Sequence, residues 1–458
     1  MKRMQTATYY ADLKQEEEKL IMNENFTYKM KLTDDEVAIL HGSKGETMAK
    51  IMKTLVLYGD AFGAEKFVSV AGNKGHLVTS FGISVLKPVF NITQELIDAG
   101  LKVDETFTVD PRPIDYTNVK CNPLQKLIFN KILYGMQDSY EKQLHQLGLK
   151  SSKSFTCACY LDEVGNTPKK GDILSWAESS AVVYANSVLG ARCNRNSGII
   201  ELFGSILGKV PEFDLLTDAG RKAKWIIEVK TTKIPEAQVL GSAIGMKVME
   251  DVPYVKGLDK WIGTELNDAT KAYLKDFGAA TASNGAVGLY HIENLTPEAV
   301  EMGADLINAD AKTYVIDDAE LERVYKNYPV IWKDKNATPK LCFIGCPHLS
   351  YEQLGEWAER IDEECKKQGK KTVQIRTIVT TAPEVLERFK KENKAAYNKF
   401  LIRGVNLSYI CPLMYMNNPL CGGETSNVIT CSNKLRTYTT ARYFTTEDIT
   451  KIVVKGGY

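Results

Sequence analysis

The sequence lacks a long apolar run, has almost no net charge, and contains no cysteine pair of the CxxC kind. Without about 20 consecutive apolar residues, no segment is expected to span a membrane as a helix. The formal net charge is +1 over 458 residues, which argues against a basic surface for nucleic acid or for an anionic membrane. The absence of CxxC pairs argues against zinc ribbons and ferredoxin-type sites.

The length and the cysteine content bound the class of protein. A chain of 458 residues predicts two or three domains with sizeable cores. The N-terminal segment MKRMQTATYYADLKQEEEKL has no apolar core of a secretory signal and is too acidic for a transit peptide, so we expect a cytoplasmic protein. In that reducing compartment the ten cysteines are not expected to form disulfides. Most are interpreted as buried apolar side chains, and a minority as metal ligands.

Alternating strands and helices predict an α/β protein of several domains, with parallel or mixed sheets flanked by helices. The pattern is clearest near the C-terminus, where we expect a strand, a helix, a strand, a helix and a strand over 341–344, 351–367, 371–377, 382–392 and 406–410. We expect three regions: an N-terminal extension over 1–30, an α/β region of two subdomains over 31–335, and a C-terminal α/β domain over 336–458.

Local signals predict several earlier elements. Thr33 and Glu36 have the spacing of a capping box at the start of a helix. Apolar residues at helical spacing predict helices over 46–58 and 123–147. A strand is expected over 154–161, and the stretch of small residues over 175–189 predicts a buried helix.

Four cysteine segments are candidates for metal binding: TCACY with Cys157, IGCPHLS with Cys346, SYICP with Cys411 and TCSNKLRTY with Cys431. Cys346 and Cys411 each follow a predicted strand. Ligands of parallel sheets bind beyond the carboxyl ends of the strands, so we expect these two cysteines to face one crevice. Ligands that come from distant segments are typical of a cluster built into an active site. The alternative for each cysteine is a buried free thiol.

Five segments of the chain resemble, in order, the signature blocks of the aconitase X large subunit: LTDDEVAILHGSKGETMAKIMKTLVLYGDAFGA, TCACYL, SWAESSAVVYANSVLGARCNR, IGCPHLS and TCSNKLRTY. The similarity covers most of the chain from about Leu32 onward. It implies aconitase-like domains without the swivelling domain, which we expect on a separate small subunit. It also implies a hydro-lyase that uses an iron–sulfur cluster, with a 4Fe-4S form expected before a 2Fe-2S form.

The resemblance implies a small hydroxy acid as the substrate. Dehydration of cis-3-hydroxy-L-proline or a related hydroxy acid is the first expectation, and dehydration of phosphomevalonate is the alternative. A non-catalytic metal- or RNA-binding protein is the alternative of another class. The balanced charge argues against RNA, because phosphate contacts require clustered lysine and arginine.

The resemblance also implies roles for particular cysteines. Cys157, Cys346 and Cys411 are the expected cluster ligands, and Cys431 is the rival for the third position. Three thiolates leave one iron of a cubane free to act as a Lewis acid on the substrate hydroxyl. Cys193 and Cys431 stand where the family is expected to carry small polar residues.

Further polar residues are candidates for the rest of the site. The expected catalytic group comprises His76, Glu178, Ser179 and Lys434. The expected substrate-binding group comprises Ser43, Lys44, Gly75, Asn186, Arg192, His348 and Ser432. Arg192 and Lys434 suit a carboxylate or a phosphate, with a structural salt bridge as the alternative for each. The alternative for the two histidines is an ordinary turn residue.

Overall fold

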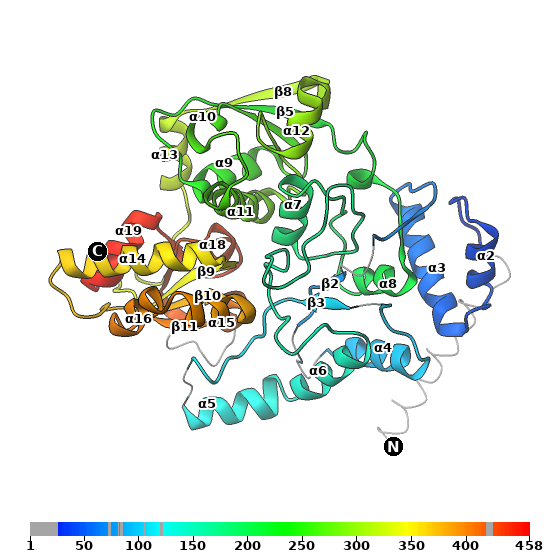
Figure 1. The fold of residues 1–458 in the computed structure, drawn as a ribbon, viewed down its shortest axis with the longest axis horizontal. Coiled ribbons are helices and arrows are strands. Elements are labelled where there is room, and N and C mark those ends of the chain that lie inside the picture. The colour runs from blue at the N-terminus through cyan, green and yellow to red at the C-terminus, as the bar shows by residue number, and fades with distance from the viewer. Residues whose placement is uncertain are drawn as a thin grey trace.

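The computed structural model describes residues 26–71, 75–80, 82, 86–104, 106–119, 122–417 and 425–458. Most of the extension expected over 1–30 and part of the turn before Gly75 therefore lie outside the described residues. Three α/β units follow one another along the chain (Figure 1). In that view the first unit occupies the right and the bottom, the second the top, and the third the left.

The first unit combines a parallel and an antiparallel strand pair with helices. Strands β2 and β3 pair in parallel, whereas β1 and β4 pair antiparallel. Its elements are α2 (Asp34–Leu40), α3 (Glu46–Ala61), β1 (Phe67–Ser69), β2 (Gly75–Leu77), α4 (Lys87–Asp98), β3 (Phe107–Val109), α5 (Pro123–Ile128), the π-helix η1 (Phe129–Leu133), α6 (Gln137–Gln146), α7 (Ser179–Ser187), α8 (Ile200–Leu207), β4 (Lys209–Pro211) and the 3-10 helix η2 (Asp214–Leu216).

The second unit contains a parallel sheet in the order β7-β6-β5-β8. Helices α9 and α11 pack against each other beside it (Figure 1). Its elements are β5 (Ala223–Val229), α9 (Ala237–Val248), β6 (Pro253–Lys256), α10 (Asp259–Ile262), α11 (Asp268–Gly285), β7 (His291–Ile292), α12 (Pro297–Met302), η3 (Gly303–Leu306), β8 (Ile307–Ile316) and α13 (Asp318–Lys326).

The third unit contains a parallel sheet in the order β11-β10-β9-β12-β13. Its buried β9 carries no polar outer face, which is typical of a strand covered by helices on both sides. Its elements are β9 (Leu341–Leu349), α14 (Tyr351–Lys367), β10 (Arg376–Thr381), α15 (Pro383–Glu392), α16 (Lys394–Ile402), β11 (Asn406–Ser408), α17 (Pro412–Met416), η5 (Thr425–Asn427), β12 (Val428–Thr430), α18 (Asn433–Tyr438), β13 (Arg442–Tyr443) and α19 (Thr446–Lys455).

Several predicted elements agree with the structure, and others differ for local reasons. The capping box of Thr33 and Glu36 is present, and α14 spans the expected residues. The helix expected over 123–147 is divided: α5 and η1 end at Leu133, and α6 begins at Gln137 after a turn that contains Gly135. The apolar pattern continues across this turn and so does not reveal it. The segment expected as a strand over 154–161 forms turns, and within it Phe155 makes an isolated bridge with Val109.

The end of β9 also differs from the expectation. Cys346 lies inside the last part of this strand rather than beyond it. Regular pairing with β10 ends at Ile344 and resumes only at Leu349. Gly345 between them has φ +101, a conformation that favours glycine. The irregular segment therefore places Cys346 at the edge of regular pairing, near the carboxyl end of the sheet.

Helix α11 is the element on which the units converge. It contacts α9, α7, α18, α14 and β9. Its last turns are rich in small residues, which allow the α9 backbone to approach closely. A Cβ added at Gly245 of α9 would lie 2.6 Å from the Thr281 carbonyl oxygen of α11.

Among the residues that the structure describes, none of the helices combines the length and the apolar composition that a membrane span requires.

The close contact of α9 with α11 predicts a stability difference between two helical glycines. We expect Gly245→Ala to destabilise the protein by about 1–3 kcal/mol, because the added methyl group overpacks the contact. Gly355→Ala in α14 is the matched control, since its nearest neighbouring atom would be 3.8 Å away. It should be neutral or stabilising by about 0.5–1 kcal/mol. Urea unfolding of both variants measures this, and equal midpoints would contradict the close contact.

Candidate active site

The carboxyl edge of the third unit's sheet brings four predicted site residues together. Cys346 lies near the end of β9, and Cys411 is the N-cap of α17 after β11. Ser432 is the N-cap of α18 after β12, and Lys434 lies in the first turn of that helix. The Ser432 hydroxyl donates to the Cys346 carbonyl oxygen and accepts from the Leu435 N–H at 3.1 Å. Parallel topology accounts for this, because strand ends of one polarity meet at one edge.

Lys434 forms a buried ion pair with Glu178, which links the third unit to the first. The Lys434 ammonium contacts the Glu178 carboxylate and lies 3.3 Å from the Ser180 Oγ. Glu178 caps α7, where its Oε1 accepts from the Ser180 N–H at 3.0 Å. Burial would raise the pKa of Glu178, but Lys434 and Ser180 outweigh burial and lower it to about 2. Burial would lower the pKa of Lys434, but Glu178 and its other anionic neighbours raise it above its usual range.

A second polar group lies at the ends of β2 and β3. The His76 Nε2 is 3.1 Å from Asp110 Oδ1, and its Nδ1 is 2.8 Å from Thr108 Oγ1. Burial lowers the pKa of His76 to about 4, so the imidazole is neutral at physiological pH. Burial, followed by the charge of Glu178, raises the pKa of Asp110 well above its usual range. The two polar groups are therefore coupled through Glu178 and Asp110.

Three thiols form one electrostatic group, those of Cys157, Cys346 and Cys411. Burial raises the pKa of all three, that of Cys346 to about 11. Cys346 further raises the pKa of both other thiols, and the Lys434 ammonium lowers the pKa of all three. The fold therefore brings three distant cysteines into reach of one another and of a buried cation.

Cys431 has different neighbours. Burial raises the pKa of its thiol, followed by the charges of Asp276 and Glu236. Burial and then Cys431 raise the pKa of Cys342 in β9. After burial, the charges that raise the pKa of Cys431 are thus those of acidic residues that line the space between the second and third units, and none of the other three thiols is among them.

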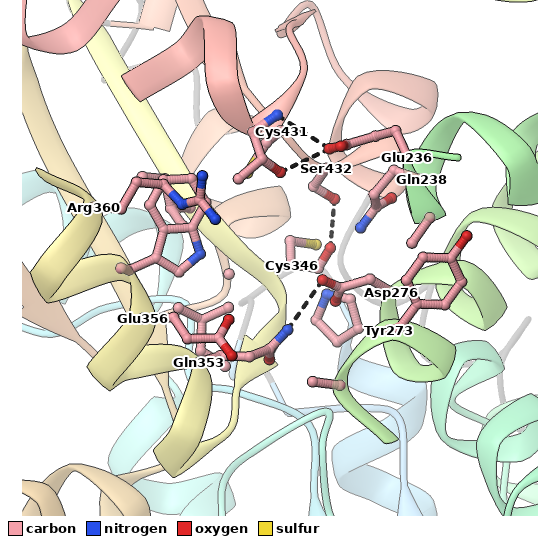
Figure 2. Close-up of a pocket in the computed structure, with 18 of the residues that line it drawn as sticks. Glu236, Gln238, Tyr273, Asp276, Cys346, Gln353, Glu356, Arg360, Cys431 and Ser432 are labelled. Carbon is pink, nitrogen blue, oxygen red and sulfur yellow. Dashed lines mark hydrogen bonds between the residues drawn. The ribbon is translucent and has the colours of Figure 1, made fainter. Parts of the chain in front are cut away.

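A cavity of about 490 Å³ lies between the second and third units, and Cys346, Cys431 and Ser432 form part of its lining. Figure 2 shows Cys346 in the middle of this lining, between Ser432 and Asp276. The other charged lining residues are Arg360 and the carboxylates of Glu236, Asp276, Glu356 and Glu447. An excess of carboxylates disfavours an anionic ligand. This cavity is therefore not a phosphate site, and the phosphate of a phosphorylated substrate would have to bind elsewhere.

The chain matches family models over most of its described length. The model for "Aconitase X first domain" matches residues 29–219, and that for "Aconitase X second domain" matches residues 223–326. The phosphomevalonate dehydratase large subunit of Thermococcus kodakarensis is 34% identical over 72% of this chain and 77% of its own length. The chain belongs to the aconitase X family.

Further relatives agree with this assignment. The crystal structure of Thermococcus kodakaraensis aconitase X in its holo-form matches with a TM-score of 0.75 and 27% identity, covering 93% of this chain and 100% of that one. The cis-3-hydroxy-L-proline dehydratase of Hypocrea jecorina is 24% identical over 77% of this chain. The family resemblance and the α/β fold predicted from the sequence are thus confirmed, and the family's dehydratases identify a hydro-lyase.

In the structure of this chain, four predicted substrate-binding residues lie away from the three thiols. Ser43 and Lys44 are exposed in the turn between α2 and α3, at the opposite side of Figure 1 from α18. The Asn186 side chain donates to the carbonyl oxygens of Cys193 and Gly288, at 2.8 Å each. Arg192 donates to Asp218 at 2.5 Å and to the Leu216 carbonyl at 3.0 Å. Arg192 thus makes the structural salt bridge that was its alternative, and substrate roles for all four stay predictions.

The structure gives local structural roles to three other predicted residues. Gly75 allows close packing in β2, since an added Cβ would lie 2.7 Å from the Ser205 Oγ. Both ring nitrogens of His348 face protein atoms, with Nδ1 2.9 Å from Thr156 Oγ1 and Nε2 3.2 Å from the Ile410 oxygen. Ser179 opens α7, but the next residue, Ser180, is the one that contacts Lys434.

Asp110 and Ser180 were not predicted from the sequence. Asp110 directly follows β3, so a carboxylate at a strand end was the available signal. Strand β3 has only three residues and was not predicted, so the position of Asp110 at a strand end was not apparent. Ser180 lies beside Ser179 in the AESSA segment, where sequence gives no way to choose between neighbours on a helix that starts at this point.

The donor set of the three thiols fits an iron–sulfur cluster. Soft thiolates from separate segments suit iron–sulfur sites, and the backbone N–H of His348 donates to the Cys157 Sγ at 3.4 Å, a contact that stabilises thiolate charge. In the part of the chain that the structure describes, no three His, Cys, Asp or Glu side chains could hold a single metal ion. Cluster ligands bind separate iron atoms and need not meet at one point.

The Lys434–Glu178 pair predicts a characteristic response to substitution. Lys434→Met should destabilise the protein by about 3–5 kcal/mol, because it leaves a buried carboxylate without its cation. The double variant with Glu178→Gln should recover part of the loss, since the uncompensated charge is then absent. Chemical denaturation measures both.

Lys451→Met is the control for this prediction, because Lys451 pairs with Glu447 at the surface, where the side chains are 45% and 75% exposed. Its effect should stay within about 1 kcal/mol. A double variant less stable than Lys434→Met alone would show that the unpaired charge is not the cause.

Proposed function

We propose that this chain is the large subunit of a phosphomevalonate dehydratase. The observation that carries the proposal is the agreement of five curated relatives of that name, which are 28–34% identical over 71–79% of this chain. The two cis-3-hydroxy-L-proline dehydratases match less well, one at 24% identity and the other over 46% of this chain. The comparisons thus support the alternative substrate more than the one expected first.

We further infer that a separate small subunit completes the enzyme. The chain covers 75–81% of the relatives named large subunit. It covers 56% and 35% of the two hydroxyproline dehydratases, which are therefore considerably longer than the region they share with it. The name "large subunit" itself implies a second polypeptide, and the chain's similarity to those proteins supports the same arrangement here.

Cys157, Cys346 and Cys411 are the proposed ligands of an iron–sulfur cluster. When bound, a four-iron cluster with three thiolate ligands supplies a Lewis-acidic iron for the departing hydroxyl group. The buried Lys434 ammonium offsets the negative charge of the thiolates, because its charge lowers the pKa of all three. Cys431 is the weaker candidate, since none of these three thiols is among the groups that shift the pKa of its own thiol.

The proposed acid–base group is Asp110. Dehydration requires a group that accepts a proton from the carbon next to the hydroxyl-bearing carbon. A carboxyl group whose pKa is raised by burial and by Glu178 can exchange a proton nearer to neutral pH than an exposed aspartate can. Neutral His76 orients this carboxyl group at 3.1 Å. Lys434 keeps Glu178 ionised, which maintains the raised pKa of Asp110.

Single Cys→Ser variants test the ligand assignment. Replacement of Cys157, Cys346 or Cys411 should lower the iron and sulfide content of protein purified without oxygen, because each removes one thiolate. Cys431→Ser and Cys365→Ser, the latter at a buried position of α14, should retain the content of the unaltered protein. Full iron content in all of the first three variants would refute the cluster site. Loss of iron in Cys431→Ser would instead identify Cys431 as a cluster ligand.

The substrate is tested with the chain co-purified with its small subunit. We expect dehydration of phosphomevalonate and at least about tenfold lower kcat/KM for cis-3-hydroxy-L-proline, since a site that recognises one acid loses charge-assisted hydrogen bonds with an acid of another shape and charge. Absorbance of the unsaturated product and mass spectrometry measure turnover. Preference for the hydroxyproline would restore the substrate expected first.

A further inference from the structure

Lys275 is a buried cation on α11 that the proposed chemistry does not use. The residue is 3% exposed, although it lies on a helix of the second unit. Its ammonium group donates to the His348 carbonyl oxygen at 3.1 Å and to Asp276 Oδ1 at 3.0 Å. The first contact joins the second unit to the irregular end of β9. Burial of a lysine is costly unless its charge and its donors find partners, and here the carboxylate of Asp276 and the carbonyl oxygen of His348 supply them.

The residue that Lys275 holds is directly connected to the thiol group. His348 accepts from Lys275 with its carbonyl oxygen and donates its N–H to the Cys157 Sγ at 3.4 Å. Its ring is fixed at both nitrogens, by Thr156 Oγ1 and the Ile410 oxygen. His348 also lies two residues after Cys346 on β9. A shift of this one residue would therefore move a hydrogen bond to one proposed ligand and the backbone of another.

Lys275 also changes the charge balance around the thiols. Its ammonium lies 3.1 Å from the carbonyl oxygen of His348, whose N–H reaches the Cys157 sulfur at 3.4 Å, so a full positive charge lies close to the proposed ligands. The charge of Lys434 is balanced by buried Glu178, whose side chain is 8% exposed. The partner of Lys275 is Asp276, whose side chain is 28% exposed and lines the 490 Å³ cavity. Solvent weakens the influence of Asp276 more than that of the buried cation, so a net positive influence of Lys275 remains.

We propose that Lys275 is a positioning residue for the cluster. It holds His348 so that the His348 N–H meets the Cys157 sulfur, and its cation offsets the charge that three thiolates and a cluster bring into a low-dielectric interior. This inference rests on the proposed function, because it requires a cluster at Cys157, Cys346 and Cys411. It adds a contact from the second unit to a site otherwise formed by the first and third.

The test compares Lys275→Met with Lys275→Arg in protein purified without oxygen together with its small subunit. Partners of metal ligands typically contribute 10- to 100-fold to metal retention. We expect Lys275→Met to lose iron to a chelator about tenfold faster and to have a more negative midpoint potential, because less positive charge stabilises the reduced cluster. Lys275→Arg should restore most of both properties, since it retains the cation.

Lys271→Met is the matched control, one turn earlier on α11 and also lining a cavity with Lys275. It should retain the iron-loss rate and the midpoint potential of the unaltered enzyme. Asp276→Asn provides an independent variant with the opposite sign, because it removes the anion beside Lys275 and should make the midpoint potential more positive. It keeps the proposal testable if Lys275→Met does not fold.

The outcomes separate this inference from the function on which it rests. An iron-loss rate and a midpoint potential unchanged in Lys275→Met, with only the thermal unfolding midpoint lowered, would overturn the positioning role and leave a structural ion pair. If Lys275→Met does not fold, an unchanged or more negative midpoint in Asp276→Asn would also overturn it. Absence of iron from the unaltered enzyme would overturn the proposed cluster itself.

Discussion

The buried ion pair of Lys434 and Glu178 is the interaction on which the candidate site depends. It joins the first turn of α18 to the N-terminus of α7, and thereby the carboxyl edge of the third unit to the first unit. Two charges are removed from water here, which is costly unless each has a close partner. Because the partner is supplied by another unit, correct docking of the units is a condition for satisfying both charges. Within the pair, Glu178 adds to the effect of burial in raising the pKa of Asp110, and Lys434 lowers the pKa of the three thiols against the effect of burial.

Helix α11 gives this arrangement its second support. Its small residues let α9 approach closely on one side, and its contacts with α7, α18 and β9 connect all three units. Lys275 extends the helix's role from packing to charge, because it reaches the backbone of His348 beside the thiols.

Some features were predictable from the sequence because they depend on local order along the chain. The helix over 351–367 and the capping box at Thr33 follow from neighbouring residues, and both are present. The turn at Gly135 between η1 and α6 and the irregular end of β9 were not predicted, because the apolar pattern of the sequence continues through both. Among the site residues, Glu178 and Lys434 were candidates from the family blocks. Asp110 was missed because its strand is only three residues long.

The sequence by itself determined the family, the α/β class and a set of cysteines in distant segments, because ordered blocks and local patterns survive without coordinates. Only the tertiary structure decided which polar groups meet. It paired Lys434 with Glu178, coupled Cys157 and Cys411 to Cys346, and associated Cys431 with Asp276 and Glu236. It also gave Arg192 a structural partner in Asp218. Charge interactions fall off with distance in space, and distance in space between segments far apart in the chain is set by how the units pack.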